Sequence, residues 1–364
     1  MIIAFLINDI NNQGGTEHVT TVIANSLSKE ERIEFISILS IQNGNSTVYP
    51  LNGSIILNSL NMQNINTIFR RIIIPDKIER FVIDNHIDIL ICVDTGPYTY
   101  LTKIRKKKLC KIIVWEHFNY FNQPKGIRDK LKKKRIAKTA DALVVLSKHD
   151  IKNYQSHIKK IKNIVCIYNP ISVRHDLTSD IEKHRVIAVG RLVPQKGFDI
   201  LIRIWKYVEN SGEASDWKLD IYGSGPEKKK LENLIVDENV KNIMIHPFSN
   251  NIGNEYLHSS IFVLPSRFEG FALVLGEAQA FGLPIISFDI HEGSNEIVED
   301  GKNGFLISPY DIKSMSQKLL ILMNDKEMRK EFSRRSKENL SRFFLQNVKK
   351  KWLSLLDELY DEKD

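Results

Sequence analysis

The sequence predicts an α/β protein built from two doubly wound domains with parallel sheets. Short β-rich runs alternate with segments of helical period along all 364 residues, a pattern typical of parallel sheets covered by helices. This length is enough for two domains of ordinary size, and a hydrophobic content of 42% is that of a globular protein with substantial cores. We therefore expect two Rossmann-like domains that face each other across a cleft at the carboxyl ends of their strands.

The first domain is expected to cover residues 1–169. Its β-rich runs predict strands at residues 2–7, 33–40, 54–57, 87–93, 111–115, 142–146 and 164–167. Apolar residues at helical spacing predict helices within residues 16–27, 65–85 and 128–138. Several strands joined through helices are expected to pair in parallel, so their carboxyl ends should share one edge of the sheet.

The second domain is expected to cover residues 170–345, after a hinge near residues 169–177. Its strands are predicted at residues 185–189, 217–222, 243–246, 261–264, 284–288 and 304–307. Helical periodicity continues at residues 311–323, 326–342 and 346–360. We expect the final segment, residues 346–364, to form a helix that packs back on the first domain.

Targeting signals and cysteine frameworks are not evident. No apolar run approaches the roughly 18 residues that a membrane-spanning helix needs, and the start MIIAFLINDI lacks the basic region and cleavage site of a signal peptide. We therefore expect a cytoplasmic protein. Its three cysteines are too few and too scattered to suggest a disulfide framework or a zinc site, and we expect no metal centre.

Positive charge is concentrated in the first half of the chain. Residues 1–169 contain 25 Lys and Arg against 14 Asp and Glu, although the whole chain carries a net charge of only +8. Much of the excess lies within residues 103–138, at Lys106, Lys107, Lys108, Lys130, Lys132, Lys133, Lys134 and Arg135. Such a patch attracts an anionic membrane or a lipid-linked pyrophosphate, or is simply a solvated surface. Nucleic acid is not expected, because aromatic residues do not alternate with the basic ones.

Two glutamates lie eight positions apart in the segment EGFALVLGEAQAFGLPII, at Glu269 and Glu277. We expect a helix that opens at about Phe271 and offers its N–H groups and positive dipole end to a phosphate. Glu277 would lie about two turns into this helix, and Glu269 just before it. Carboxylates beside an anion site are poor phosphate ligands but good acceptors for sugar hydroxyls. The spacing therefore suggests a nucleotide-sugar site.

A second candidate motif, GRLVPQKGFD, places Arg191 and Lys196 between a predicted strand and a helix that starts near Phe198. Two cations at the carboxyl end of a strand could neutralise a diphosphate, Arg191 with a planar fork and Lys196 as a point charge. Taken alone, the motif is equally that of a loop with exposed cations. Its occurrence beside the glutamate segment favours the diphosphate interpretation.

Glycine-rich turns follow two other predicted strands. In NNQGGTEHV, Gly14 and Gly15 precede a helix that we expect Thr16 to cap, so the backbone there could approach a phosphate or an acceptor sugar. In YGSGPE, Gly223 begins a tight turn that we expect to line the nucleotide pocket. This segment is not a dinucleotide fingerprint, because Lys228 occupies the position of the third glycine.

His117 and Glu116 follow the predicted strand at residues 111–115, in VWEHFNYF. His117 could bring either its imidazole or its backbone carbonyl to the cleft, or it could be a structural hydrogen-bonding residue. Its place near the carboxyl end of the sheet favours a role in the site. Glu116 is a further polar candidate at the same place.

The ordered motifs resemble those of GT-B glycosyltransferases of family 4 over nearly the whole chain, most closely in the second half. They are GGTEHV, WEHFN, VVLSKHD, YNPI, GRLVPQKGFD, YGSGPE, VLPSRFEGFALVLGEAQAFGLPII and NEIVEDGKNGFLI. The resemblance implies a retaining transfer of a sugar from a nucleotide diphosphate sugar, with no further cofactor. The segment HEGSNE at residues 291–296 departs from the Gly-Pro that often precedes the glutamate in this family, which leaves the role of Glu296 open.

The resemblance also implies roles for single residues. Arg191 and Lys196 would hold the donor diphosphate, helped by the amides of Gly270, Phe271 and Ala272. Glu277 would bind the ribose hydroxyls, and Glu269 the hydroxyls of the transferred sugar. His117 would contact the sugar near its reacting carbon, and Gly15 would lie beside the phosphates on the opposite wall.

The expected reaction moves a hexose or N-acetylhexosamine from a UDP-linked donor to a saccharide, such as a lipid-linked precursor of a surface polysaccharide. The resemblance favours attack from the front face, and the sequence contains no D-x-D triplet for a metal ion. Three alternatives stay open: another GT-B enzyme such as an epimerase or phosphorylase, a Rossmann dehydrogenase, and a non-catalytic membrane-associated protein. The failed fingerprint disfavours the dehydrogenase.

Overall fold

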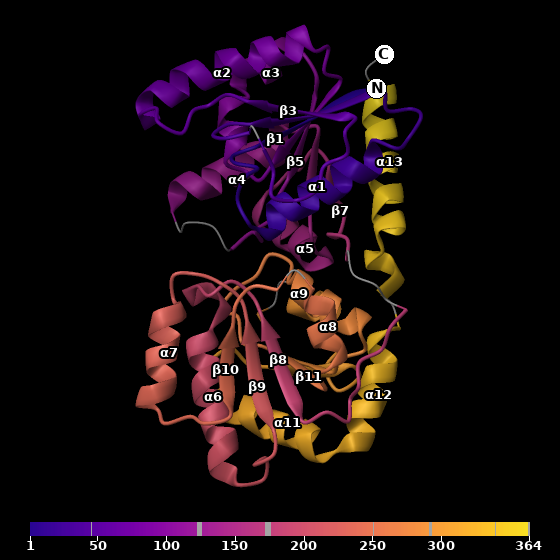
Figure 1. Ribbon diagram of the computed structural model, residues 1–364. Helices are drawn as coiled ribbons and strands as arrows, with labels where there is room; N and C mark the ends of the chain where they lie inside the picture. Colours follow the sequence, from indigo (N-terminus) through magenta and orange to yellow (C-terminus); the bar gives the residue numbers. More distant parts are fainter. Residues whose placement is uncertain are drawn as a thin grey trace. The chain divides into compact units, whose positions relative to one another are not determined.

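The chain forms two compact units (Figure 1). The computed structural model describes residues 1–44, 46–121, 126–171, 176–249, 251–290, 293–338 and 340–362. Unit 1 comprises Met1–Pro170 and Leu345–Asp364, and unit 2 comprises Ile171–Phe344. The sequence placed these boundaries after residues 169 and 345. Part of the predicted hinge, residues 172–175, lies outside the described residues.

Unit 1 is built on a parallel sheet of seven strands. In chain order they are β1 (Ile2–Ile7), β2 (Phe35–Ser40), β3 (Ile55–Ser59), β4 (Ile89–Val93), β5 (Lys111–Trp115), β6 (Ala142–Val145) and β7 (Ile164–Cys166). Their order in space is β3-β2-β1-β4-β5-β6-β7. The winding direction therefore reverses between β1 and β4, and this is where open α/β sheets bind ligands.

Helices cover the sheet of unit 1 on both faces. They are α1 (Gly15–Leu27), α2 (Thr67–Asp84), α3 (Thr102–Lys107), α4 (Ile127–Thr139) and α5 (Lys148–His157), with the 3₁₀ turn η1 (Pro97–Tyr100) before α3. Apolar residues of α2, α3, α4 and α5 form one continuous core with β1, β4, β5 and β6. Right-handed crossovers place these four helices together on one face and α1 on the other.

The last helix, α13 (Leu345–Asp361), packs beside α1 in unit 1. Its Trp352 is fully buried and meets Trp115 of β5 edge-on, with 4.9 Å between ring centroids. An ion pair of 2.6 Å joins Lys349 to Glu30. The C-terminal segment of the chain thus completes the unit that the first residues begin.

Unit 2 is built on a parallel sheet of six strands. They are β8 (Arg185–Val189), β9 (Lys218–Tyr222), β10 (Ile243–His246), β11 (Ile261–Leu264), β12 (Ile285–Phe288) and β13 (Gly304–Ile307). Their order in space is β10-β9-β8-β11-β12-β13. The reversal lies between β8 and β11, so the loops that follow these two strands share the switch point of this unit.

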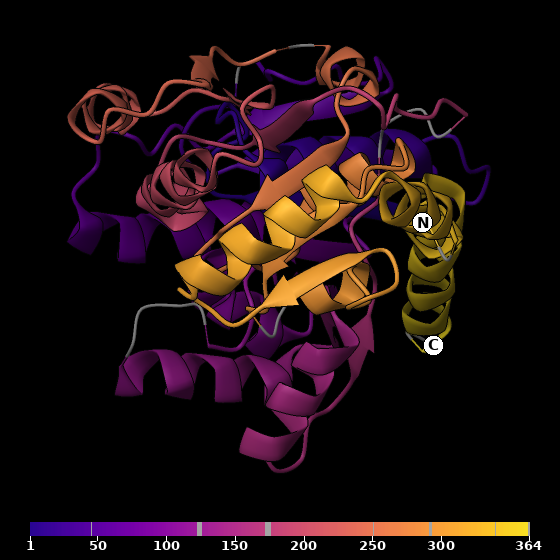
Figure 2. The same cartoon turned by 90° about the horizontal axis from the view of Figure 1, so that it is seen from below.

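The helices of unit 2 are mostly short, apart from two that pack against each other on one face of the sheet. These two are α6 (Phe198–Ser211) and α11 (Ile312–Asn324), and the ribbon can be followed from below in Figure 2. They share an apolar core around Trp205. The other elements are η2 (Pro194–Lys196), α7 (Lys228–Asp237), α8 (Ile252–Leu257), α9 (Leu273–Ala280), α10 (Ser294–Ile297), α12 (Lys326–Ser336) and η3 (Leu340–Phe343). Both units are Rossmann-like, as the sequence predicted.

Three predicted helix limits are wrong. Helix α1 begins at Gly15 with Gly14 at its N-cap, so Thr16 lies inside the first turn and does not cap it. Helix α9 begins at Leu273 rather than Phe271, because Ala272 has a non-helical backbone (ψ 77°). Helix α12 ends at Ser336 rather than residue 342. The Ser336 hydroxyl there contacts the carbonyl oxygens of Leu283 and Asn303, at 3.3 and 3.4 Å, and a separate 3₁₀ turn follows.

No helix in the described part of the chain combines the length and the apolar composition that a bilayer-spanning segment needs.

Candidate active site

An ion pair lies at the switch point of unit 2. Lys196 ends the turn η2 after β8, and Glu269 lies in the loop after β11; Lys196 Nζ is 2.6 Å from Glu269 Oε1. Only 15% of the Lys196 side chain and 7% of the Glu269 side chain are exposed. Two residues 73 positions apart meet because β8 and β11 are neighbours whose carboxyl ends share one edge. The structure thus brings together two of the residues that the sequence singled out.

Neighbouring side chains hold the Glu269 carboxylate in place. The Ser266 hydroxyl donates to Oε1 at 2.6 Å, so this oxygen accepts bonds from both Ser266 and Lys196. The Gln195 amide donates to the carbonyl of Phe268 at 3.0 Å and lies 3.5 Å from Oε2. A buried carboxylate is costly unless it is paired and hydrogen-bonded, and both conditions are met here.

The two loops that carry the ion pair are also tied to each other. Arg267 binds Asp199 at the start of α6 through two parallel hydrogen bonds of 2.8 and 2.7 Å. The Arg267 backbone N–H donates to the carbonyl of Gln195 at 2.8 Å. A bidentate pair restricts geometry more than a single contact does. The separation of the Lys196 and Glu269 backbones is therefore fixed from outside the pair.

Close backbone contacts explain two glycines in this region. Gly197 has φ +69°, and a Cβ there would lie 2.0 Å from the carbonyl oxygen of Pro265. A Cβ on Gly223 would lie 1.9 Å from the carbonyl oxygen of Gly190. Any other residue would push these loops apart. The YGSGPE turn therefore packs directly against the loop that carries Lys196.

Glu277 lies in the second turn of α9, nearer to the helix start than predicted because α9 begins later. Burial raises the pKa of its carboxyl group, while a hydrogen bond from Tyr256 and the charge of Lys196 act in the opposite direction. The Tyr256 hydroxyl donates to Oε2 at 3.4 Å. Lys196 therefore influences both glutamates of the motif, one by direct contact and one through its charge.

The segment Gly270–Ala272 joins Glu269 to the start of α9. Ala272 is the N-cap residue there, and no side-chain hydrogen bond caps this end of the helix. Gly293, at φ +105°, packs over this segment; a Cβ on it would lie 3.4 Å from the Gly270 oxygen and the Phe271 Cα. Arg191 lies in the same loop as Lys196 but is exposed, and no side-chain contact of it is described within the ranges that the structure covers. The arrangement thus leaves Arg191 at the surface of the loop.

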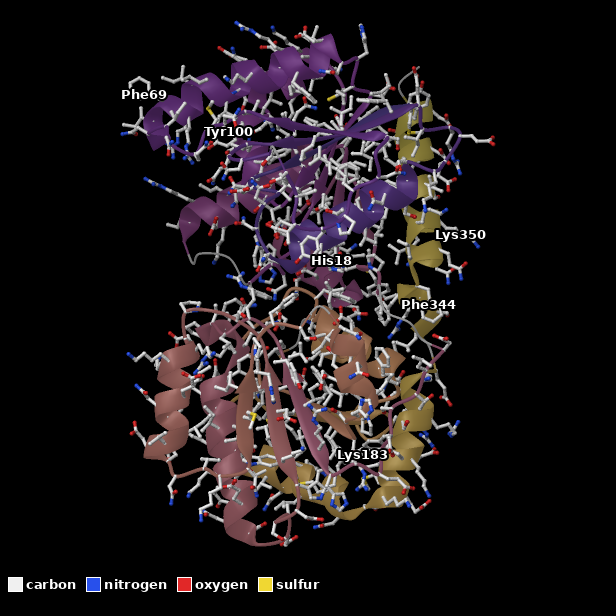
Figure 3. All side chains as sticks on the ribbon, in the orientation of Figure 1. His18, Phe69, Tyr100, Lys183, Phe344 and Lys350 are labelled. Carbon is white, nitrogen blue, oxygen red and sulfur yellow. The ribbon has the colours of Figure 1, made fainter. Side chains whose placement is uncertain are left out.

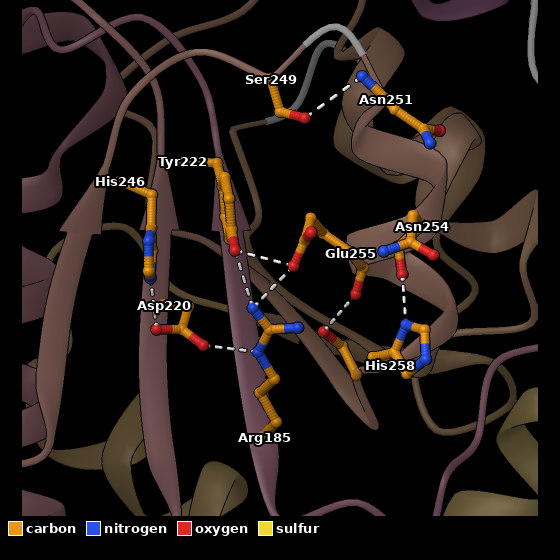
Figure 4. Close-up of polar contacts among 10 residues, drawn as sticks. Arg185, Asp220, Tyr222, His246, Ser249, Asn251, Asn254, Glu255 and His258 are labelled. Atoms are coloured by element: carbon orange, nitrogen blue, oxygen red, sulfur yellow. Dashed lines mark hydrogen bonds and ion pairs between the residues drawn. The ribbon is translucent and has the colours of Figure 1, made fainter.

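A polar network supports the strand ends beside the site (Figure 4). Arg185 of β8 contacts Asp220 of β9 and Glu255 of α8, the latter at 2.9 Å, and Tyr222 donates to the same Glu255 oxygen at 2.7 Å. His246 of β10 contacts Asp220 at 2.7 Å and stacks on Tyr222 with 4.4 Å between centroids. Burial and the bond to Glu255 raise the pKa of Tyr222 to about 12. These contacts hold three strands in register just before the Gly223 turn.

The switch point of unit 1 carries Gly14, Gly15 and Asp94, which follow β1 and β4. Asp94 has a left-handed backbone (φ 68°), and its Oδ1 accepts the backbone N–H of His117 at 3.2 Å. Burial raises the pKa of the Asp94 carboxyl group to about 7. Asp94 was not among the predicted site residues; a polar residue directly after the buried run at residues 89–93 was the available signal.

His117 is nearly buried, with 7% exposure, and its ring lies 4.4 Å from the Trp115 ring. Its Nε2 has no hydrogen-bond partner in the described structure. Burial lowers the pKa of the imidazole to about 3, because the charged form is poorly solvated there. The side chain is therefore neutral near pH 7 and has an unsatisfied ring nitrogen.

Glu116 belongs to a buried cluster with Lys133, Asp150 and Tyr154. Its Oε2 accepts the Tyr154 hydroxyl at 3.1 Å, and Lys133 donates to the carbonyls of Asn119 and Tyr120, both at 2.8 Å. Burial raises the pKa of Glu116 to about 8 and that of Asp150 to about 6, and it lowers the pKa of Lys133. Lys133 is 2% exposed, so its assignment to the basic surface patch was wrong.

Other supporting residues were also missed. Ser266 lies three positions before Glu269, within the quoted motif, so its place could have been noticed. Gln195 adjoins Lys196 and could have been noticed in the same way. Tyr256 lies 21 positions before Glu277, and nothing in the local pattern links the two.

Two Rossmann-like units with parallel sheets are the architecture of GT-B glycosyltransferases, and known proteins of that fold are similar to this chain. Residues 172–339 match the family described as Glycosyl transferases group 1. An uncharacterized glycosyltransferase of Haemophilus influenzae is 30% identical over 97% of this chain and 99% of its own. The chain therefore belongs to the glycosyl transferases group 1 family and is a glycosyltransferase.

Two further similarities cover almost the full length of both proteins. An N-acetyl-D-galactosaminyltransferase of Campylobacter jejuni, whose name specifies a GalNAc-containing diNAcBac-PP-undecaprenol, is 26% identical over 99% of each chain. The structure of HepE from Anabaena in complex with UDP and glucose has a TM-score of 0.81 at 16% identity, covering 99% of this chain and all of that one. At that identity the structural similarity shows the fold alone.

Proposed function

We propose that this glycosyltransferase moves a hexose or N-acetylhexosamine from a UDP-sugar to a saccharide acceptor with retention of anomeric configuration. The observation that carries the proposal is the ion pair between Lys196 and Glu269 at the switch point of unit 2. A cation for a diphosphate and a carboxylate for sugar hydroxyls stand side by side there. The UDP and glucose bound by HepE, which shares the fold, support this donor class.

The donor is bound by predicted site residues of unit 2. Lys196 and the exposed Arg191 neutralise the diphosphate, and the amides of Gly270, Phe271 and Ala272 at the start of α9 assist them. Glu277 accepts the ribose hydroxyls, and Gly223 shapes the turn against the nucleotide. When a phosphate reaches Lys196, the cation is shared between it and Glu269. Glu269 thereby gains freedom to accept a sugar hydroxyl.

Unit 1 supplies the residues for the transferred sugar and the acceptor. Gly14 and Gly15 let the backbone approach the phosphates or the acceptor, and His117 contacts the sugar near its reacting carbon. Because the imidazole of His117 is neutral, it can exchange a hydrogen bond with a hydroxyl group without attracting the diphosphate.

In the proposed reaction, the bond between the anomeric carbon and the leaving phosphate breaks while the acceptor oxygen attacks from the same face. The acceptor proton passes to the leaving phosphate oxygen, so no side-chain nucleophile is required. Negative charge develops on the phosphate, and Lys196, Arg191 and the helix amides stabilise it. Each such donor is worth about 2.7–4 kcal/mol in comparable anion sites. In the proposed reaction these side-chain cations neutralise the leaving diphosphate, as a metal ion does in enzymes that have a D-x-D triplet.

We further propose that the acceptor is a lipid-linked precursor of a surface polysaccharide, handled at the cytoplasmic face of the membrane. The Campylobacter relative supports this class, because its name specifies an undecaprenol-linked saccharide. The positive charge of residues 1–169 is suited to a lipid-linked pyrophosphate.

The proposal is tested by incubating the purified protein with a panel of radiolabelled UDP-sugars and bacterial lipid extracts. We expect label to move into the lipid fraction from one donor, with an α linkage when that donor is α-linked. Inverted configuration would contradict the retaining reaction. Isomerised or phosphorolysed sugar without a new glycosidic bond would instead identify an epimerase or a phosphorylase. Reduction of a nicotinamide would identify a dehydrogenase.

A further inference from the structure

One layer of unit 1 combines exposed apolar side chains with a strong excess of positive charge. The helices α2, α3 and α4 together contain 15 Lys and Arg against four Asp and Glu. At the start of α2, Ile68, Phe69 and Ile72 are 69%, 60% and 63% exposed. Figure 3 shows Phe69 at the outer end of this helix. Large apolar side chains in such a setting cost free energy in water and suggest a partner.

The acidic groups of this layer are largely neutralised within it. Asp76 and Glu79 of α2 pair with Lys103 and Lys107 of α3, and Asp129 of α4 pairs with Lys132. Lysine and arginine side chains that stay exposed on the same helices, or directly after α3 in the case of Lys108, are Arg71, Lys77, Arg80, Lys106, Lys108, Arg128, Lys130, Lys134, Arg135 and Lys138. The outer surface of the layer is therefore cationic even after its internal ion pairs are counted.

A second group of exposed apolar side chains lies at the same edge of the sheet as Ile68, Phe69 and Ile72, which form the first apolar tip. Ile127 and Leu131, in the first turns of α4, are 78% and 58% exposed. Helices α2 and α4 each follow a parallel strand and run back to the start of the next one, so both begin at the carboxyl edge. The loops with Gly14 and His117 lie at this edge too. Both apolar tips therefore stand on the side of unit 1 that carries its proposed substrate residues.

We propose that the α2–α3–α4 layer docks unit 1 on an anionic bilayer surface, with Phe69 and Ile72 inserted at the headgroup level. Apolar side chains among Lys and Arg on amphipathic helices are the combination that binds such interfaces. A protein partner would need an acidic surface for the cations and an apolar surface for the exposed Phe and Ile side chains. An anionic bilayer offers both, in its headgroups and its acyl chains. This inference rests on the proposed function, because docking is useful if the acceptor is lipid-linked. Docking would then bring the acceptor residues of unit 1 to the membrane that holds the acceptor.

Vesicle sedimentation tests the inference. The full chain should sediment with phosphatidylcholine vesicles that contain phosphatidylglycerol but not with phosphatidylcholine alone, and added salt should release it. The double substitution Phe69→Ser and Ile72→Ser should weaken binding roughly tenfold or more. The triple substitution Arg71→Gln, Lys77→Gln and Arg80→Gln should weaken it by at least about tenfold. All these side chains are exposed, so circular dichroism should show unchanged folding.

Matched controls come from unit 2. Val236 on α7 is 76% exposed, and Val236→Ser should leave vesicle binding unchanged. The exposed lysines Lys229, Lys241 and Lys313 should be replaceable together by Gln without a comparable loss. Equal losses in these controls would mean that general charge or hydrophobicity, not this layer, attracts the protein, and would overturn the inference.

Two other outcomes would overturn it as well. If the wild-type chain ignores anionic vesicles, the layer does not bind membranes. If sedimentation velocity shows dimers that the Phe69→Ser and Ile72→Ser protein cannot form, a second copy covers the face. Failure of the proposed function is distinguishable, because Lys196→Ala should lower transfer about 100- to 1000-fold yet sediment with vesicles like the wild type. Transfer to a soluble acceptor without vesicle binding would refute the docking inference alone.

Discussion

The switch points of the two sheets hold their candidate site residues in opposite ways. In unit 2, Lys196 and Glu269 satisfy each other at 2.6 Å, and Ser266 adds a further bond. In unit 1, the half-buried Asp94 and the buried His117 have little countercharge nearby, and their pKa values move to about 7 and about 3. The first site holds its charges as an ion pair, whereas burial in the second disfavours the charged forms of both groups.

This difference fits the proposed roles of the two units, with the diphosphate bound by unit 2 and the sugar contacted by unit 1. A diphosphate requires a fixed positive charge, which an ion pair can redistribute without moving a proton. A sugar requires neutral or weakly charged hydrogen-bonding groups in an apolar setting, which burial provides. The two environments also depend on different parts of the chain. The loops after β8 and β11 build the first, whereas packing around Trp115, including α13, supports the second.

The largest effect is expected at the packing that supports unit 1. Trp352→Ala removes a fully buried ring that contacts Trp115, which in turn contacts His117. Stability should fall by about 3–5 kcal/mol in denaturant unfolding. Tyr360→Ala, at an exposed position of the same helix α13, should change it by well under 1 kcal/mol. Similar small losses for both would show that α13 does not support this edge.

The next largest effect is expected at the charge pair of unit 2. Lys196→Ala should lower the transfer rate about 100- to 1000-fold, because the developing phosphate charge loses its cation. Circular dichroism should show an intact fold, and Lys183→Ala, at an exposed lysine of the same unit (Figure 3), should transfer at the wild-type rate. Near-normal turnover by the Lys196 variant would remove the basis for the division described above.

A smaller effect concerns the pH dependence of stability in unit 1. The pKa of Glu116 is raised to about 8 from 4.5, so the folded chain holds this proton more tightly than the unfolded chain. The resulting stabilisation is complete below about pH 4.5 and is lost as the pH rises through about 8. Glu116→Gln, which cannot ionise, should escape a loss on the order of 1–3 kcal/mol between about pH 5 and 8.

Unfolding curves at a series of pH values measure this effect. The control is Glu358→Gln, which replaces an exposed carboxylate on α13 and should keep the wild-type pH dependence. If the Glu116 variant also keeps it, the buried cluster is ionised in the folded state, and the contrast between the two units is smaller than described.

The smallest effect is expected at Glu277. Tyr256→Phe removes the hydroxyl that donates to its carboxylate at 3.4 Å, a bond worth about 0.5–1.5 kcal/mol. Donor affinity should fall by roughly two- to tenfold, and most at low pH, because loss of this donor raises the pKa of Glu277 further. Titrations at two pH values measure this. Unchanged affinity at both would show that Tyr256 does not position Glu277.

The sequence predicted the two sheets well, because buried parallel strands are continuous apolar runs bounded by turn residues. It also predicted that Lys196 and Glu269 lie at strand ends, from which their proximity follows. It could not predict the positive φ of Asp94 or the burial of Lys133, because both depend on how distant elements pack. Helix limits failed at Thr16, Phe271 and residue 342, because the ends of a helix are its least sharply determined part.

The proposed division of roles assigns Glu269 to the transferred sugar and the neighbouring cations to the nucleotide. Calorimetric titration of UDP and of the matching UDP-sugar into the wild-type and Glu269→Gln proteins tests it most directly. We expect both ligands to bind the wild type, and we expect the substitution to weaken UDP-sugar binding roughly tenfold while leaving UDP binding within about twofold. Equal weakening of both ligands, or no binding of UDP to the wild type, would contradict it.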